Sequence, residues 1–329
     1  MEKFKSFFLE QPIWAFLILV TLFFSLFAPN FFDIQNFQNI LIQASTLGII
    51  ALGMTLVMIN GNIDLSVGAI LAFCAVVMVD AQSWPIFAQL GDWSILCAFF
   101  MAILAGMFLG GLNGFLVWKT GVNAFIVTLG AMIGIRGLVF VYTQEQSLFA
   151  MNFLFSDIGM SSVPVGPLAV PTIAILFLVL VALVHLLLTR TVHGRNTFAV
   201  GGNPEAAVNA GIRVGPHMFV NYLILGGLTG LAGVTLSSQM GAATPNLGRD
   251  YELWVITGVV LGGTKLAGGY GSILRSFAGI LSIAILRNGM NMMQVQAFYV
   301  YVILGGILIA VLILDKQLSS RKVRLSEQV

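Results

Sequence analysis

No group of residues in this chain has the spacing of a catalytic or nucleotide-binding site. A phosphate-binding loop needs the pattern G-x-x-x-x-G-K-[ST]; residues 258–265 come nearest, but a Gly-Lys pair occurs nowhere in the sequence. The histidines (His185, His193 and His217) form no H-E-x-x-H pair and no ligand-like cluster with acids or cysteines. A G-x-S-x-G nucleophile motif is absent as well. We therefore expect no catalytic residue and no metal site, and we expect any ATP hydrolysis to take place on a partner.

The polar segment 189–216 stands out between apolar runs and predicts a short helix over about residues 204–210. Asn203 can accept hydrogen bonds from the first free N–H groups of this helix. Pro204 suits the first helical position, where its missing N–H costs nothing. Glu205 places a carboxylate in the first turn, where the helix dipole favours negative charge.

The rest of this helix is built from small residues. Ala206 and Ala207 continue the first turn, and Gly211 can end the helix in the left-handed conformation. A helix of about two turns is too short to be stable alone in water. Its small side chains would let the backbone of another protein come close, so it is a candidate docking helix. The alternative is a surface helix that merely joins two membrane spans.

Some polar residues lie within or beside apolar runs and are candidates for lining the path of a polar solute: Asn60, Asn62, Asp64, Asn123, Thr128, Arg136 and Asn291. Arg136 is costly in an apolar run unless it faces the bundle interior or water, although it could instead extend to the outer interface. Asp64 lies in the glycine-bearing break 61–68, where it could line the path, cap the next helix, or do both. Each of the others could be a helix cap or an interhelical hydrogen bond.

The composition predicts a membrane protein. The chain has 329 residues, of which 58% are hydrophobic and 9% are charged, whereas soluble domains have about 25% charged residues. At about 20 residues per span, the apolar runs accommodate about ten helices. We therefore predict an all-α polytopic protein with one transmembrane domain over 1–329. Cys74 and Cys97 lie in apolar runs and are expected to pack there rather than to form a disulfide.

The predicted spans cover about residues 12–28, 40–59, 65–79, 93–118, 123–142, 171–188, 217–238, 253–263, 273–291 and 298–314. The fourth span carries Gly106, Gly110 and Gly114 at a spacing that allows close helix contact. With a cytoplasmic N-terminus, 12 of the 15 basic residues fall on the inner side: Lys3, Lys5, Lys119, Arg190, Arg195, Arg213, Lys265, Arg275, Lys316, Arg321, Lys322 and Arg324. Following the positive-inside rule, we predict that both termini and the segment 189–216 are cytoplasmic.

Several strings resemble one family of transport proteins. They are E-A-A-x₃-G at 205–211 with its flanks from residue 194, G-x-I-D-L-S-V-G at 61–68, F-I-V-T-L-G at 125–130 with R-G-L at 136–138, and G-G-T-K-L-A-G-G-Y-G-S at 262–272. Together they resemble the permease subunits of ABC importers, in the branch for ribose and other simple sugars that includes autoinducer-2-like systems. The similarity extends from about residue 30 to about residue 310, which is most of the chain. The classical loop continues with Ile and Leu-Pro, and that continuation is missing from 216–221.

The resemblance implies a set of partners. In that family the short helix, here Asn203 to Gly211, docks in a groove on an ATPase subunit that holds ATP and Mg, so this chain needs no cofactor of its own. A sugar-binding protein outside the cell would deliver the solute, with Arg249, Asp250 and Glu252 as candidate docking charges. A second permease subunit, identical or related, would complete the path across the bacterial inner membrane. Ribose or a related monosaccharide is the implied cargo.

Two alternatives and a repeat remain open at this stage. A secondary transporter would usually need a pair of ionisable residues within the membrane, and only Arg136 lies deep in a span. An ABC permease for another solute, such as a branched-chain amino acid, belongs to the same superfamily and is not excluded. The residues 61–68 can also be laid over 262–269, which would divide the chain into two related halves.

Overall fold

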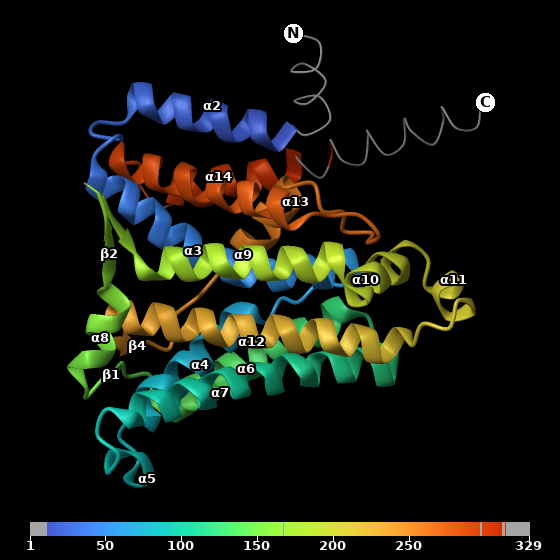
Figure 1. The fold of residues 1–329 in the computed structure, drawn as a ribbon, viewed down its shortest axis with the longest axis horizontal. Coiled ribbons are helices and arrows are strands. Elements are labelled where there is room, and N and C mark those ends of the chain that lie inside the picture. The colour runs from blue at the N-terminus through green and yellow to red at the C-terminus, as the bar shows by residue number, and fades with distance from the viewer. Residues whose placement is uncertain (1–11, 167, 297, 311–312, 314–329) are drawn as a thin grey trace.

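The computed structural model describes residues 12–166, 168–296, 298–310 and 313, and these residues form a bundle of helices (Figure 1). The helices are α2 (Pro12–Phe27), α3 (Ile34–Ile59), α4 (Val67–Ala81), α5 (Pro85–Ala88), α6 (Trp93–Thr120), α7 (Ala124–Thr143), α8 (Phe153–Met160), α9 (Thr172–Arg190), α10 (Val192–Gly202), α11 (Pro204–Asn209), α12 (Val214–Met240), α13 (Tyr251–Leu261) and α14 (Ile273–Met292). A further apolar helix covers Phe298–Ala310.

Two very small antiparallel sheets accompany the helices. Strand β1 (Leu148–Phe149) pairs with β4 (Ala242–Ala243), and β2 (Ser162–Val165) pairs with β3 (Leu168–Pro171). The sequence did not lead us to expect these strands. They lie in the connections at one end of the bundle and leave its all-helical architecture unchanged.

Each predicted span coincides with an apolar helix over its described residues, and residues 311–312 and 314 of the last predicted span lie outside them. Among the described residues, six helices are long and apolar enough to cross a membrane, and α2, α4, α13 and Phe298–Ala310 are shorter apolar helices. The chain is thus a polytopic helical membrane protein, while the count of about ten crossings stays a prediction. Helix α3 begins at Ile34 rather than near residue 40, because the Asp33 side chain caps it by accepting from the Gln35 N–H at 3.2 Å.

Glycines bring α6 and α12 into close contact, as their spacing predicted. A Cβ atom placed on Gly106 would lie 2.4 Å from the Gly226 carbonyl oxygen, and one on Gly110 would lie 2.5 Å from the Tyr222 carbonyl oxygen. Any larger residue at these positions would force the two backbones apart. Helices α6 and α12 are therefore closely packed, and both contact the break between α3 and α4.

Helix α4 begins beside the middle of α12 rather than at an end of the bundle. The segment before α4 lies near the start of α12, because the Tyr222 hydroxyl donates to the Ile63 carbonyl at 3.0 Å. The first turns of α4 lie farther along, where a Cβ on Gly233 would be 2.6 Å from the Leu71 carbonyl oxygen. Residues 60–66 therefore run back into the bundle from the end of α3 before α4 starts.

Helix α13 begins at the same place and runs the other way. A Cβ on Gly68 would lie 2.4 Å from the Gly248 carbonyl oxygen and 2.5 Å from Glu252 Oε2, so the starts of α4 and α13 touch. Helix α4 then leads to α5 at one end of the bundle, and α13 leads to the loop 262–272 near α10 at the other end (Figure 1). The two short helices thus diverge from a shared junction inside the bundle.

The backbone does not follow the predicted repeat of 61–68 over 262–269. Gly61 has a φ of +83°, whereas Gly262 has a helical φ of −65° and it is Gly263 that has a φ of +83°. A different relation is visible instead. Helices α3 and α12 each end beside a left-handed glycine, Gly61 or Gly241, and each is followed by a re-entrant segment and a short helix.

The two ends of the bundle differ in charge. The end that carries α10, α11 and the loop 262–272 (Figure 1) has the described basic residues of the predicted inner side: Lys119, Arg190, Arg195, Arg213, Lys265 and Arg275. The opposite end carries α5 and α8 with acidic residues such as Asp80, Asp92 and Asp157. The predicted location of the two termini concerns residues 1–11 and 314–329, which lie outside the described residues.

Candidate coupling segment and buried polar network

Helix α11 forms as its sequence predicted. The Asn203 side chain accepts a hydrogen bond from the Ala206 N–H at 2.9 Å, Pro204 occupies the first position, and Glu205 lies in the first turn. At the other end Gly211 adopts a φ of +82°, which lets the Ile212 N–H donate to the Ala207 carbonyl at 3.0 Å. Both ends of this six-residue helix are therefore closed by local interactions.

The outer side of α11 is free to meet another molecule. In Figure 1 the helix projects beyond α10 at its end of the bundle. Ala207 faces the protein and is 3% exposed, whereas Glu205, Ala206 and Val208 are exposed. The helix thus presents a carboxylate and small apolar side chains on the surface that the sequence predicted for docking.

A second helix, α10, precedes α11 where we expected a loop. Thr191 caps it, because its hydroxyl accepts from the Gly194 N–H at 3.2 Å. The glycines and polar residues of this stretch hide the apolar periodicity of a helix. Thr191, a residue type that commonly caps a helix, is the sequence signal that could have indicated the start of α10.

Helix α10 packs directly on the end of α3. A Cβ atom on Gly201 would lie 1.7 Å from the Ile59 carbonyl oxygen, so only glycine fits there. The same carbonyl accepts a hydrogen bond from the Gly269 N–H at 2.8 Å. The last turn of α3 is therefore contacted by both α10 and the loop 262–272.

Buried and half-buried polar side chains join α10, α12 and α3. His193 Nε2 lies 2.7 Å from Asn221 Oδ1, and Asn221 Nδ2 donates to Asn60 Oδ1 at 2.8 Å. The Thr197 hydroxyl donates to the His193 carbonyl and lies 3.0 Å from His217 Nε2. Because the Thr197 hydroxyl has one hydrogen, its contact with His217 uses the ring N–H as donor.

The sequence had pointed to only one member of this network, Asn60. His193 and His217 were considered as metal ligands and set aside, and Asn221 was not considered. The ring centroids of His193 and His217 lie 4.4 Å apart, and Asn221 is fully buried. Asn221, an asparagine within the apolar run of α12, is the sequence signal for this network, because a buried amide needs hydrogen-bond partners.

Asp64 lies in a second buried network next to the first. Its Oδ1 accepts from the Ser66 N–H at 2.7 Å and from the Ser66 hydroxyl at 2.6 Å, and Asn113 Nδ2 of α6 lies 3.3 Å from Oδ2. The carboxyl group is completely buried. Asp64 thus fixes the turn that leads into α4, while Asn62 is held by Asn60 and Met218 nearby.

The other predicted path residues lie apart from this cluster. Arg136 donates to the Pro245 and Leu247 carbonyls, each at 2.8 Å, and so holds the re-entrant segment before α13. Asn123 caps α7 and is exposed, and Thr128 is buried and donates to its own helix at Ala124. Asn291 is exposed near the end of α14. A role for these four in transport stays a prediction.

The predicted docking charges differ in accessibility. Arg249 is exposed, and Asp250 is half-buried with an oxygen 3.4 Å from the Tyr301 hydroxyl. Glu252 is buried against Gly68 at the junction of α4 and α13. Of the three, only Arg249 and Asp250 reach the surface, and they do so beside the junction of α4 and α13 rather than at the end of the bundle, so their docking role stays a prediction.

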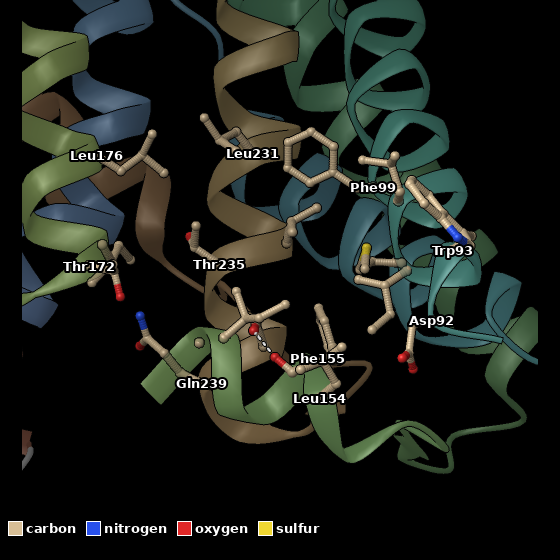
Figure 2. A pocket seen from close by; sticks show the side chains of 18 residues that line it. Asp92, Trp93, Phe99, Leu154, Phe155, Thr172, Leu176, Leu231, Thr235 and Gln239 are labelled. Carbon is tan, nitrogen blue, oxygen red and sulfur yellow. Dashed lines mark hydrogen bonds between the residues drawn. The ribbon is translucent and has the colours of Figure 1, made fainter. Parts of the chain in front are cut away.

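A cavity of about 650 Å³ lies at the opposite end of the bundle from α11. Figure 2 shows Trp93 and Phe99 of α6, Leu154 and Phe155 of α8, and Leu176 of α9 around it. Its few polar groups lie at the margins, with Thr172 and Gln239 on one side and Asp92 on the other. The largely apolar lining does not suit a polar solute, so this cavity is not the candidate path.

Comparisons with known proteins extend over most of the chain. A profile of the family described as branched-chain amino acid transport system / permease component matches residues 36–312. The D-allose transport system permease protein of Escherichia coli (strain K12) is 35% identical over 318 residues, which cover 97% of this chain and 93% of that protein. The ribose import permease protein of Bacillus subtilis (strain 168) is 36% identical over 309 residues, which cover 92% of each chain.

A third relative is the L-arabinose ABC transporter permease protein of Azospirillum brasilense. It is 34% identical over 304 residues, which cover 92% of this chain and 86% of that protein. No solved structure matches the chain. The three relatives are named for different sugars at nearly equal identity, so the comparison does not single out one of them.

Proposed function

This chain belongs to the family of branched-chain amino acid transport system permease components, a family of multi-pass membrane permeases in bacterial ABC importers, and we propose that it carries a monosaccharide into the cytoplasm. The observation that carries the proposal is the similarity, over more than nine-tenths of the chain, to permeases named for D-allose, ribose and L-arabinose. Ribose or a closely related sugar is the first cargo to test. A branched-chain amino acid, as in the description of the family, is the alternative cargo.

ATP hydrolysis takes place on a partner in this proposal. The sequence has no phosphate-binding loop of its own, so ATP and Mg would bind to an ATPase subunit and this chain would need no cofactor. The exposed outer face of α11 supports docking to that subunit, because Glu205 and small side chains are presented away from the bundle. Motion of the ATPase would then reach the membrane spans through α11.

Two further partners complete the proposed transporter. A sugar-binding protein outside the cell would dock on the loop before α13, where Arg249 and Asp250 are accessible. A second permease subunit, identical or related, would complete the path. This pairing rests on the resemblance to ABC permeases.

Uptake into proteoliposomes tests the proposal. The chain would be reconstituted with its ATPase and binding protein, and ATP-dependent uptake of radiolabelled ribose, allose, arabinose and leucine would be compared. We expect uptake of a sugar that requires ATP and is lost in Glu205→Ala, because α11 then lacks its exposed carboxylate. Asp157→Ala, which removes an exposed acid at the opposite end of the bundle, is the control and should transport normally.

Three outcomes would contradict parts of this proposal. Uptake that follows an ion gradient without ATP would indicate a secondary transporter and make α11 a simple connection. ATP-dependent uptake of leucine but of no sugar would indicate the amino-acid alternative. Normal uptake by Glu205→Ala would be compatible with an ABC importer but would show that Glu205 is not needed for docking.

A further inference from the structure

The buried network that begins at His193 connects the docking segment with a distant part of the chain. His193 belongs to α10, which is joined to α11 through Asn203 alone, so the two short helices form one continuous segment. From His193 the hydrogen bonds run to Asn221 of α12 at 2.7 Å and on to Asn60 at the end of α3 at 2.8 Å. Three segments far apart in sequence therefore meet through three side chains.

The contacts around this chain of hydrogen bonds leave little room for sliding. Gly201 of α10 lies against the Ile59 carbonyl, where even a Cβ atom would approach to 1.7 Å. Asn221 is fully buried and Asn60 is 5% exposed. Buried hydrogen bonds are directional and costly to break, so a displacement of α10 has to be followed by the end of α3 or break these bonds.

The connection continues to the junction inside the bundle. The residue after Asn221 is Tyr222, whose hydroxyl donates to the Ile63 carbonyl at 3.0 Å. Ile63 precedes Asp64, which holds the turn into α4, and Gly68 of α4 touches Glu252 at the start of α13. Adjacent residues of α12 thus hold both ends of the break between α3 and α4.

We infer that His193 and Asn221 are positioning residues that transmit movement of the docking segment to Asn60 and the break between α3 and α4. The inference rests on the proposed function and specifies how α11 acts on the membrane spans. His193 is the input, because it lies on the segment that the ATPase would move. Asn221 is the centre, because its amide oxygen accepts from His193 while its amide nitrogen donates to Asn60.

The experiment measures uptake and ATP hydrolysis in the same proteoliposomes of the complete complex, with the sugar that wild type carries best. In His193→Leu and in Asn221→Leu we expect continued ATP hydrolysis and a fall of about tenfold in sugar moved per ATP, within the usual range for coupling between sites. The double variant should fall no further than either single variant, because both changes interrupt the same connection. His193→Gln keeps an N–H group that can reach Asn221 and should restore most of the coupling.

His185→Leu is the matched control. His185 is also a half-buried histidine, on the neighbouring helix α9, and its ring Nδ1 has no hydrogen-bond partner among the residues that the structure describes. The same substitution there removes a histidine without touching the connection, so the sugar moved per ATP should remain that of wild type. Thermal unfolding of each purified variant shows whether it is folded.

Several results would overturn the inference. They are a parallel loss of uptake and hydrolysis at an unchanged ratio, additive effects in the double variant, no recovery in His193→Gln, or an equal loss in His185→Leu. A wild-type complex that moves sugar without ATP would overturn the proposed function itself, and the inference with it. The measurement on the wild-type complex therefore distinguishes a failure of the proposed function from a failure of the inference about His193 and Asn221.

Discussion

At the scale of single residues, Gly211 is the residue on which the shape of the docking helix depends most directly. It adopts a φ of +82°, and no atom of the described residues lies within 4 Å of the place where a Cβ would be, so its backbone angle is what disfavours a larger residue. The left-handed conformation costs a residue with a side chain about 1 kcal/mol or more. A free-energy cost of that size shifts the equilibrium between correctly ended and unwound helices by about fivefold.

Gly211→Ala should therefore lower ATP-dependent uptake, by at most about fivefold, while leaving the rest of the fold intact. Gly202→Ala is the control, because Gly202 also has open space at its Cβ position but no positive φ. Uptake by the two variants, measured beside wild type at equal protein amounts, checks the expectation. Equal activity of both variants would show that the end of α11 does not matter for docking.

The sequence predicted α11 in detail because all of its determinants are local. Asn203, Pro204, Glu205 and Gly211 each act through neighbours a few residues away, so their roles can be derived from spacing alone. The partners of His193 cannot be derived in this way, since Asn221 and Asn60 come next to it only when α10 packs on α3. The burial of Glu252 escaped prediction for the same reason, because it depends on contact with Gly68.

At the scale of elements, the contact between α6 and α12 is the one most sensitive to side-chain size. A Cβ on Gly226 would lie 2.2 Å from the Gly106 carbonyl oxygen, which is backbone and cannot move aside alone. Overpacking of this kind costs about 1–3 kcal/mol. The glycine spacing on α6 predicted a close contact, but the identity of its partner helix required the structure.

Gly226→Ala should lower the apparent melting temperature of the purified protein by roughly 5 °C. Gly134→Ala on α7 makes the same change in a helix where no atom in the described part of the chain lies within 4 Å of the added Cβ, and there alanine should be neutral or slightly stabilising. Melting followed by tryptophan fluorescence in detergent distinguishes the two. A melting temperature of Gly226→Ala at or above that of wild type would mean that α6 and α12 are not in close contact.

The spans themselves were predictable because apolar length is a strong signal, and the match to the permease family over 36–312 confirms the resemblance seen in four motifs. Helix α10 was missed because glycines interrupt its pattern. The register proposed for an internal repeat was wrong because spacing of glycines does not reveal which of them is left-handed.

At the scale of the whole molecule, the charge difference between the two ends predicts the orientation in the membrane. Basic residues gather at the end with α10 and α11, and the positive-inside rule places that end in the cytoplasm. Asp157 of α8, at the opposite end, would then face the outside. The orientation can be tested without any partner protein.

Single cysteines introduced by Val208→Cys and by Asp157→Cys test this orientation. Val208 is 58% exposed on α11, and Asp157 is exposed on α8 at the opposite end of the bundle. In intact cells a membrane-impermeant maleimide should label only the cysteine at 157, and after the cells are opened it should label both. A Cys97→Ala background removes the half-buried native thiol, since Cys74 is buried. Labelling of the cysteine at 208 in intact cells would reverse the predicted topology.

The meeting of α4 and α13 has a consequence for how the chain is made. These helices have 15 and 11 residues, which span about 22 and 16 Å and so fall short of a hydrocarbon layer about 30 Å thick. Neither can enter the bilayer as an independent unit during synthesis. Helix α4, made early, has the backbone of Gly68 uncovered until Gly248 and Glu252 emerge much later. The contact between α4 and α13 inside the bundle can thus form only late in translation.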